Sequence, residues 1–278
     1  MIGIVTDSTS DLPADLANSL GIAVVPAYIN IGSESYRDQI DIQRSEVYSK
    51  LPSMRGLPTT SAPAPGDFIK LFDLLLSQYE HIVAIHAATE LTAIVNSASI
   101  AAQQLDAKRI TVVDSGQISM GLGWQVIEAA SQASKGASLE AVLNSIDVAK
   151  KRVKLFAAFN TMQYLARSGR VDIVRLGLST LLDIKPLIEL KTGHIDVVKR
   201  VRTWPKVKLS LIEAATEQGP FDALAVLHTN LEDQAMDLLD QFTKSGLAPQ
   251  QKMIVSVTPV IGVHTGPGAL GIRFIRKL

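Results

Sequence analysis

One pattern constrains the fold of this chain more than any other, because it occurs four times in roughly the first 150 residues: a short apolar run, then a polar segment, then a helical segment. The apolar runs are Ile2–Val5, Ile22–Ile31, His81–His86 and Ile110–Val113. Repeated strand and helix pairs are typical of an α/β domain, with a parallel sheet and helices on both faces. Ligand loops in such sheets lie at the carboxyl ends of the strands. We therefore predict that the polar segments Thr6–Ser10, Ala87–Thr92 and Asp114–Ser115 point the same way.

The pattern changes after the basic cluster Lys150–Arg152, where we place a domain boundary. The segments Ile184–Leu190 and Ile195–Arg202 alternate between apolar and polar residues on either side of a short polar turn, which predicts a β-hairpin. Helical and strand-like segments then alternate to the end. The sequence thus predicts a parallel α/β domain with hydroxyl-rich ligand loops over residues 1–152 and a mixed-sheet α/β domain over residues 153–278.

Composition and charge exclude several classes of protein. The chain has 278 residues, of which 47% are hydrophobic, and this is enough for two cores. It has 27 Lys and Arg against 27 Asp and Glu, so there is no electrostatic case for binding nucleic acid or an anionic membrane. It has no cysteine, which excludes thiolate nucleophiles and Cys-based zinc sites. We find no signal peptide and no apolar run of about 18 residues, and expect a cytoplasmic protein without a transmembrane segment.

No ordinary catalytic or nucleotide-binding motif occurs in the sequence. The five histidines have no metal-ligand spacing. Asp7, Ser8 and His264 could in principle form a triad from distant positions, but a strained nucleophile turn is absent. We therefore expect no catalytic residue, no metal and no cofactor. A small-molecule hydrolase or phosphotransferase that uses Asp7 and His264 stays as an alternative.

Several Ser and Thr residues in the predicted loops have no histidine beside them in the sequence that could act as a general base. They are Thr6, Ser8, Thr9, Thr59, Thr60, Ser61, Thr92 and Ser115. The segment Gly262–Gly271 places four glycines, one proline and His264 in ten residues, which predicts a shaped loop with a polar tip. Hydroxyls, one histidine and glycine-loop amides suit a carboxylate or phosphoryl group, because neutral donors hold an anion without an ion pair. Each hydroxyl alone is better explained by helix capping or turn formation than by ligand binding. The set favours binding over catalysis, and a sensor for another lipid or anion is a second alternative.

Five segments, in chain order, resemble the DegV family, the bacterial fatty-acid-binding proteins. These segments are Thr6–Leu12, Thr59–Pro63, Val113–Ser115, Ser168–Val171 and His264–Gly271. The resemblance implies a two-domain α/β protein that buries one long-chain fatty acid in an apolar tunnel and clamps its carboxylate with hydroxyls. It also implies that a separate ATP-dependent subunit, the catalytic subunit of fatty acid kinase, phosphorylates the bound carboxylate to an acyl phosphate. This chain would then be a non-catalytic lipid carrier.

The resemblance also implies which residues of this sequence bind the ligand. They are Thr60, Ser61, Thr92, His264, Thr265, Gly266, Arg170 and Arg202. The two arginines would suit the mouth of the site, because an acyl phosphate carries more negative charge than a carboxylate and a guanidinium group matches it.

The chain departs from the family pattern beside one of these residues. Thr92 stands where serine is usual and keeps the hydroxyl donor, whereas Ala93 and Ile94 stand in place of glycine and threonine. Ala62 and Ala64 replace the common glutamine and serine. The added bulk of Ala93 and Ile94 bears on the length and shape of the acyl chain that the protein accepts.

Overall fold

The computed structural model describes most of the chain. The described residues are 1–54, 56–169, 184–191 and 194–277. The chain forms two compact units, and each consists of two stretches of sequence. The first contains residues 1–41 and 59–151, and the second contains residues 42–58 and 152–278. The second stretch of the second unit begins at residue 152, close to the predicted boundary. Residues 42–58 also belong to that unit, whereas we predicted that each domain would be one uninterrupted stretch of sequence.

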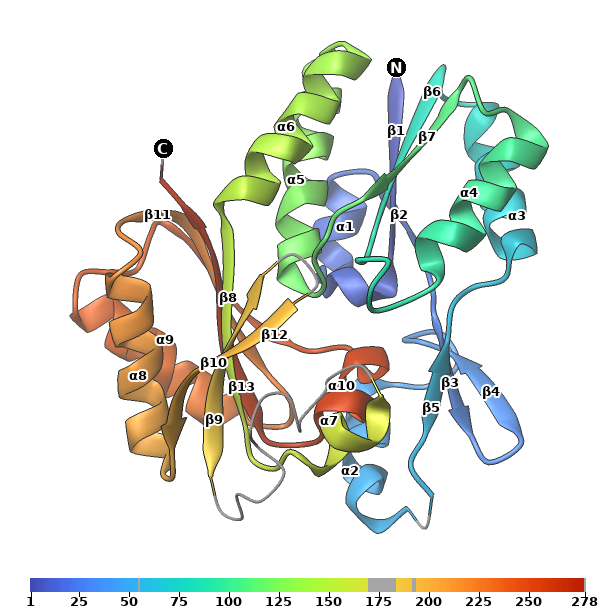
Figure 1. Cartoon of the computed structure of the whole chain (residues 1–278). Coiled ribbons are helices and arrows are strands. Elements are labelled where there is room, and N and C mark those ends of the chain that lie inside the picture. Colours follow the sequence, from blue (N-terminus) through green and yellow to red (C-terminus); the bar gives the residue numbers. More distant parts are fainter. Residues whose placement is uncertain (55, 170–183, 192–193, 278) are drawn as a thin grey trace. The chain divides into compact units, whose positions relative to one another are not determined.

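The first unit is built on a four-stranded parallel sheet, as predicted. The strand order is β2-β1-β6-β7, with bounds β1 Ile2–Asp7, β2 Ile22–Val25, β6 His81–His86 and β7 Ile110–Asp114. Two helices lie on one side of this sheet, α3 Pro65–Leu76 and α4 Ile94–Leu105. On the opposite side lie α5 Met120–Ser134 and α6 Leu139–Arg152 (Figure 1). A short helix, α1 Ala14–Ser19, packs beside β2. The polar segments after β1, β6 and β7 therefore share one edge of the sheet.

The predicted strand Ile22–Ile31 is divided at Pro26 between two sheets. Its second half belongs to a small antiparallel sheet of β3 Tyr28–Ile31, β4 Glu34–Arg37 and β5 Thr59–Ser61. Pro26 has no N–H for a strand ladder, and the Ala27 N–H donates to Ser8 Oγ at 3.1 Å. The hydroxyl-rich segment Thr59–Ser61 is an edge strand of this sheet and pairs with β3.

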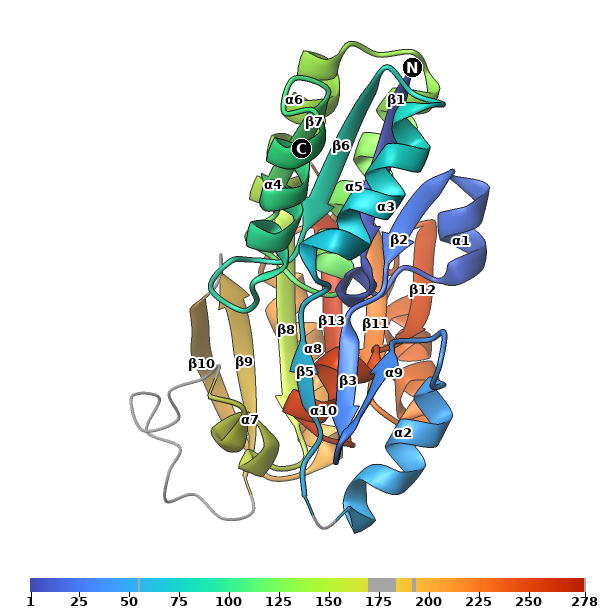
Figure 2. The same cartoon turned by 90° about the vertical axis from the view of Figure 1, so that its right-hand side faces the viewer.

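The second unit contains a mixed sheet of six strands. Its order is β10-β9-β8-β13-β11-β12, and Figure 2 shows the strands side by side in this order. The bounds are β8 Val153–Phe159, β9 Lys185–Lys191, β10 His194–Val201, β11 Phe221–His228, β12 Gln251–Ser256 and β13 Ala269–Arg276. Only β11 and β12 are parallel, and β9 and β10 form the predicted antiparallel hairpin. Helices α8 Trp204–Thr216 and α9 Glu232–Lys244 pack on one face over a core that includes Phe156, Leu224 and Phe274.

Three short helices of the second unit pack together. They are α2 Arg44–Lys50, α7 Gln163–Ser168 and α10 Pro259–Thr265, and a 3-10 turn, Leu51–Ser53, follows α2. Helix α2 is tied to the segment before α10, because the Tyr48 hydroxyl donates to the Val257 carbonyl at 2.9 Å. This bond explains why residues 42–58 belong to the second unit. Local periodicity predicts a helix here but does not show which core the helix joins.

The predicted loop over Gly262–Gly271 was wrong in extent. Pro259 occupies the first turn of α10, which continues to Thr265, and β13 begins at Ala269. Gly262 lies inside the helix, where a Cβ would overlap the Tyr48 hydroxyl, and Gly271 lies inside β13 against the Phe156 carbonyl. These two glycines are therefore explained by close packing, and only Gly266 and Gly268 have the positive φ angles expected of a loop.

Within the described residues, no helix combines the length and the apolar character needed to cross a bilayer. The same residues contain no cluster of three or more His, Cys, Asp or Glu arranged for a metal ion.

Candidate functional site

A buried hydrogen-bond network lies at the carboxyl ends of β1 and β6, centred on Asp7. Asp7 Oδ1 accepts from the Thr9 N–H at 3.0 Å and from the Thr9 hydroxyl. Asp7 Oδ2 lies 3.0 Å from His86 Nδ1 and accepts from the Ala87 N–H at 3.3 Å. Both the Asp7 and His86 side chains are fully buried. The carboxylate is thus fully bonded, and the histidine that it contacts is His86, which the hydrolase alternative did not include.

Thr92 lies in the loop between β6 and α4, half-buried. Its N–H donates to the Ala88 carbonyl at 3.2 Å. Ala93, not Thr92, is the N-cap of α4, and that end of the helix has no side-chain cap. Among the described residues, the Thr92 hydroxyl has no hydrogen-bond partner. The structure therefore removes the capping explanation for Thr92 and leaves its hydroxyl available to a ligand.

Thr60 and Ser61 are neighbours on β5. Thr60 is half-buried and pairs with Ile29 of β3, whereas Ser61 is exposed. The Asn30 amide lies 3.4 Å from Ser61 Oγ and 3.5 Å from Thr59 Oγ1. Because side chains alternate along a strand, Thr60 points to the face opposite Thr59 and Ser61. The two predicted ligands of this motif therefore cannot present their hydroxyls from the same face of β5.

His264, Thr265 and Gly266 form the end of α10 in the second unit. His264 is half-buried in the last turn, and the Thr265 hydroxyl donates to the Ile261 carbonyl at 3.3 Å. Gly266 has a φ of 77°, and its carbonyl accepts from the Thr229 hydroxyl at 2.8 Å. A Cβ at Gly266 would overlap the Tyr164 ring, so this position requires glycine for two reasons.

The two predicted arginines have different outcomes. Arg202 is exposed and directly follows β10. Arg170 lies outside the described residues. The structure thus places Thr60, Ser61 and Thr92 in the first unit and the remaining described candidates in the second.

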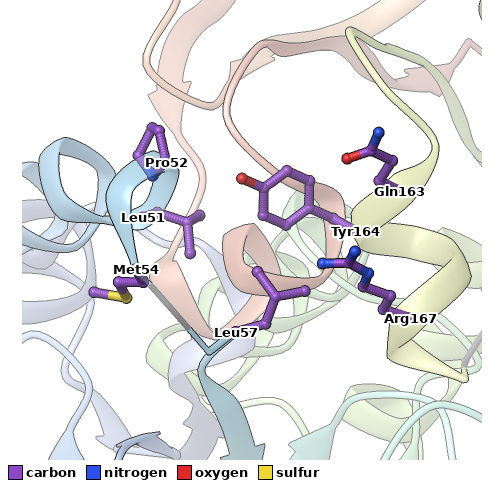
Figure 3. Close-up of a pocket in the computed structure, with 7 residues that line it drawn as sticks. All are labelled: Leu51, Pro52, Met54, Leu57, Gln163, Tyr164 and Arg167. Atoms are coloured by element: carbon purple, nitrogen blue, oxygen red, sulfur yellow. The ribbon is translucent and has the colours of Figure 1, made fainter.

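A pocket in the second unit was not predicted from the sequence. It has a volume of about 160 Å³ and is lined by Leu51, Pro52, Met54, Leu57, Gln163, Tyr164 and Arg167. Figure 3 shows Leu51 and Leu57, which follow α2, on the side of the Tyr164 ring and the Arg167 guanidinium of α7. The volume is close to that of a cavity that holds benzene, and below the roughly 300 Å³ at which ordinary ligand pockets begin. We therefore do not assign a long acyl chain to this pocket.

Sequence reasoning also missed the contact between His86 and Asp7, because we considered His86 only as a metal ligand. The available signal was its position, because Asp7 and His86 each end an apolar run that we predicted as a strand. What the sequence did not contain was the strand order that makes β1 and β6 neighbours.

The chain matches the model of one protein family over residues 1–277, and that family is described as "Uncharacterised protein, DegV family". A DegV domain-containing protein of Caldanaerobacter subterraneus subsp. tengcongensis is 32% identical over 279 residues, with 99% of each chain covered. A DegV domain-containing protein of Halalkalibacterium halodurans is also 32% identical, over 278 residues and 98% of each chain.

Solved structures agree with these sequence relatives. A DegV family protein from Thermus thermophilus, described as fatty acid binding, has 33% identity and a TM-score of 0.92, with 99% of each chain covered. A stearic-acid-binding protein from Eubacterium ventriosum has 25% identity and a TM-score of 0.91, covering 100% of this chain and 99% of its own. These similarities confirm the two-domain α/β fold predicted from the sequence.

Proposed function

This chain belongs to the DegV family, and from that premise we propose that it binds a long-chain fatty acid and holds the carboxylate with hydroxyls and a histidine. The observation that carries the proposal is the similarity to the fatty-acid-binding DegV protein from Thermus thermophilus, which extends over 99% of both chains at 33% identity. DegV proteins of this kind are described by the lipid that they bind and not by a reaction.

Thr92 is the ligand residue with the clearest support in the geometry, since its hydroxyl is half-buried and has no bond to the described residues. We assign the same role to Thr60, His264, Thr265 and Gly266, and leave out Ser61, whose hydroxyl points to the face of β5 opposite that of Thr60. Hydroxyls, an imidazole and a backbone amide are neutral donors that satisfy a carboxylate without burying a second full charge. Arg202 and Arg170 are assigned to the more highly charged acyl phosphate.

The acyl chain supplies most of the affinity in this proposal. A C16 chain has about fifteen methylene and methyl groups, and burial at ~0.8 kcal/mol each gives ~12 kcal/mol before the costs of association. The polar ligands therefore serve mainly to orient the carboxylate. They need not provide the binding free energy.

The second part of the proposal is that this chain is a carrier for a separate catalytic subunit. That subunit, a fatty acid kinase, would transfer the γ-phosphoryl group of ATP to a carboxylate oxygen and release ADP. The absence of a nucleotide-binding motif in the sequence supports this division of labour.

Native mass spectrometry of the protein as purified from cells tests the first part. We expect a bound mass equal to a fatty acid, which is lost on delipidation and restored by palmitate or oleate. A protein that purifies empty and binds neither acid would contradict the proposal. For the second part, protein with ATP and palmitate should form no acyl phosphate until a fatty acid kinase catalytic subunit is added, and turnover without that subunit would contradict the carrier role.

A further inference from the structure

We propose that Asp7 and His86 act as a positioning pair that holds the loop bearing Thr92, so that the Thr92 hydroxyl is presented to the ligand carboxylate. This inference rests on the proposed function and assigns to it two residues that do not themselves contact the ligand.

The location of the pair is the first argument. In the sheet order β2-β1-β6-β7, the chain proceeds outward in opposite directions from β1 and β6, so the order reverses between these two strands. Ligands of open parallel sheets bind beside such a reversal, outside the carboxyl ends of the strands. Asp7 and His86 are the last residues of β1 and β6, and they meet across this point.

Three successive peptide groups between His86 and Thr89 are each held by a hydrogen bond, and they connect Asp7 to the turn at Thr92. Asp7 Oδ2 accepts from the Ala87 N–H, and the next N–H, that of Ala88, donates to the Gln117 carbonyl at 2.9 Å. The Ala88 carbonyl then accepts from Leu91 at 3.0 Å and from Thr92 at 3.2 Å. Asp7 therefore fixes the peptide group before Ala87, which lies two peptide groups ahead of the one whose carbonyl holds the turn at Thr92.

The state of His86 follows from its neighbours. A carboxylate only accepts, so the hydrogen between the two residues is carried by His86 Nδ1. His86 Nε2 is buried and has no hydrogen-bond partner in the described part of the chain. The imidazole ring forms a T-shaped contact with the Phe68 ring, with 5.2 Å between the ring centroids. A second N–H at Nε2 would be an unpaired buried donor, so the neutral Nδ1–H form is favoured. A buried ring nitrogen without a hydrogen bond, such as His86 Nε2, is unusual and needs an explanation. We explain it by the other ring nitrogen, Nδ1, which orients the Asp7 carboxylate.

The loop between β6 and α4 is also held by hydrogen bonds that do not involve Asp7. A change at His86 can therefore shift the loop without unfolding the protein. The Thr89 hydroxyl and N–H both donate to Asp114 Oδ2, at 2.7 and 3.3 Å, independently of Asp7. Loss of the His86 contact should therefore loosen the loop on one side and leave the sheet intact.

The test is a double-mutant cycle on delipidated protein, with the dissociation constant for palmitate as the readout. His86→Phe removes the Nδ1 donor and keeps a ring against Phe68. We expect it to weaken palmitate binding about 10-fold, and Thr92→Ala to add little in that background, because the positioned hydroxyl is already misplaced. If the two effects multiply, Thr92 does not depend on His86 and the proposal is overturned.

The matched control is His81→Phe, at the opposite end of β6. His81 Nε2 lies 3.0 Å from Thr111 Oγ1, so this change also removes a histidine bond from the same strand. Palmitate binding should stay unchanged, and the effect of Thr92→Ala should be fully retained. An equal loss of binding in His81→Phe would reduce the role of His86 to general stability and overturn the proposal.

Two measurements on the protein without ligand keep this inference separate from the proposed function. Nitrogen NMR of the wild type should show His86 as the Nδ1–H tautomer, and the opposite tautomer would overturn the proposal even if the variants do not fold. Amide hydrogen exchange at Ala87, Ala88 and Thr92 should accelerate in His86→Phe but not in His81→Phe. Unchanged exchange would overturn the positioning role, whereas failure of wild-type protein to bind palmitate would instead refute the proposed function.

Discussion

The two units hold their candidate loops by different means. In the first unit, the segments at the carboxyl edge of the sheet are held by buried polar side chains. These include Asp7, Ser8, Thr9, Ser10, Asp11, His86, Ser115, Gln117, Ser119 and Gln125. In the second unit, the turn after α10 has one hydroxyl that bonds it, that of Thr229, and is otherwise shaped by close packing: Gly262 lies against Tyr48, and Gly266 lies against Tyr164. The first arrangement depends on many buried hydrogen bonds, and the second depends more on the absence of side-chain volume.

The two units should therefore tolerate different substitutions. Removing a carboxylate should harm the first unit most, because several buried donors would lose their acceptor together. Adding one methyl group should harm the second unit most, because a packed aromatic ring would have to move.

Asp7→Ala should lower the free energy of unfolding by about 3 to 5 kcal/mol, because it leaves the buried Thr9 N–H, Ala87 N–H and His86 Nδ1–H without their acceptor. Equilibrium denaturant unfolding measures the change. Asp73→Ala, on the exposed side of α3, is the control and should leave the midpoint almost unchanged. A loss below ~1 kcal/mol at Asp7 would show that the network is not what holds this edge.

Gly266→Ala should cost about 3 kcal/mol, from the overlap of its Cβ with Tyr164 and from the φ of 77°. Gly246→Ala separates the two causes, because Gly246 has a φ of 74° and open space around its Cβ. Unfolding of that control should show only the backbone term, about 1 kcal/mol. Equal losses at the two glycines would mean that packing against Tyr164 contributes nothing.

Thr92→Ala should weaken palmitate binding about 10-fold, since a hydrogen bond to a charged group is lost, and should change the unfolding free energy by less than ~0.5 kcal/mol. Thr92→Ser should retain binding. Thr265→Ala provides the comparison from the second unit, and its effect should be smaller, because the Thr265 hydroxyl already donates to Ile261. Titration of delipidated variants measures all three, and the reverse order would move the main ligand role to α10.

The smallest effect concerns pH and His228 at the end of β11. Burial lowers the pKa of His228, opposed in part by Glu232, and the nearby Arg44 lowers it further. Its Nδ1 accepts from the Leu231 N–H at 3.2 Å, which requires the neutral ring. The unfolded chain therefore binds the proton more readily, so stability is complete above the unfolded pKa of about 6.5 and declines as the pH falls through the lower folded value.

This decline should appear as a lower denaturation midpoint at pH 5 than at pH 7.5. His228→Asn retains an acceptor for Leu231 without a titrating ring and should show a smaller difference between the two pH values. An unchanged difference would assign the acid sensitivity to other groups.

Much of the fold could be predicted because its signals are local. The runs Ile2–Val5, His81–His86 and Ile110–Val113 are almost wholly apolar and end at polar residues, and all three are strands of the parallel sheet. The hairpin of β9 and β10 was likewise visible in alternation around a turn. The errors occurred where a residue was interpreted without its neighbours. Gly262 and Gly271 suggested a loop, but they are glycines because Tyr48 and Phe156 approach closely.

The fold class, the positions of most strands and a set of hydroxyl-bearing segments could all be predicted from the sequence, because periodicity and composition act within a few residues of the chain. The tertiary structure alone decided that β1 and β6 are neighbours, which joins Asp7 to His86 across 79 positions. It also decided that residues 42–58 pack on the second unit. The physical reason is that strand order and helix docking depend on which apolar surfaces and buried donors satisfy one another at long range, and no local pattern records that choice.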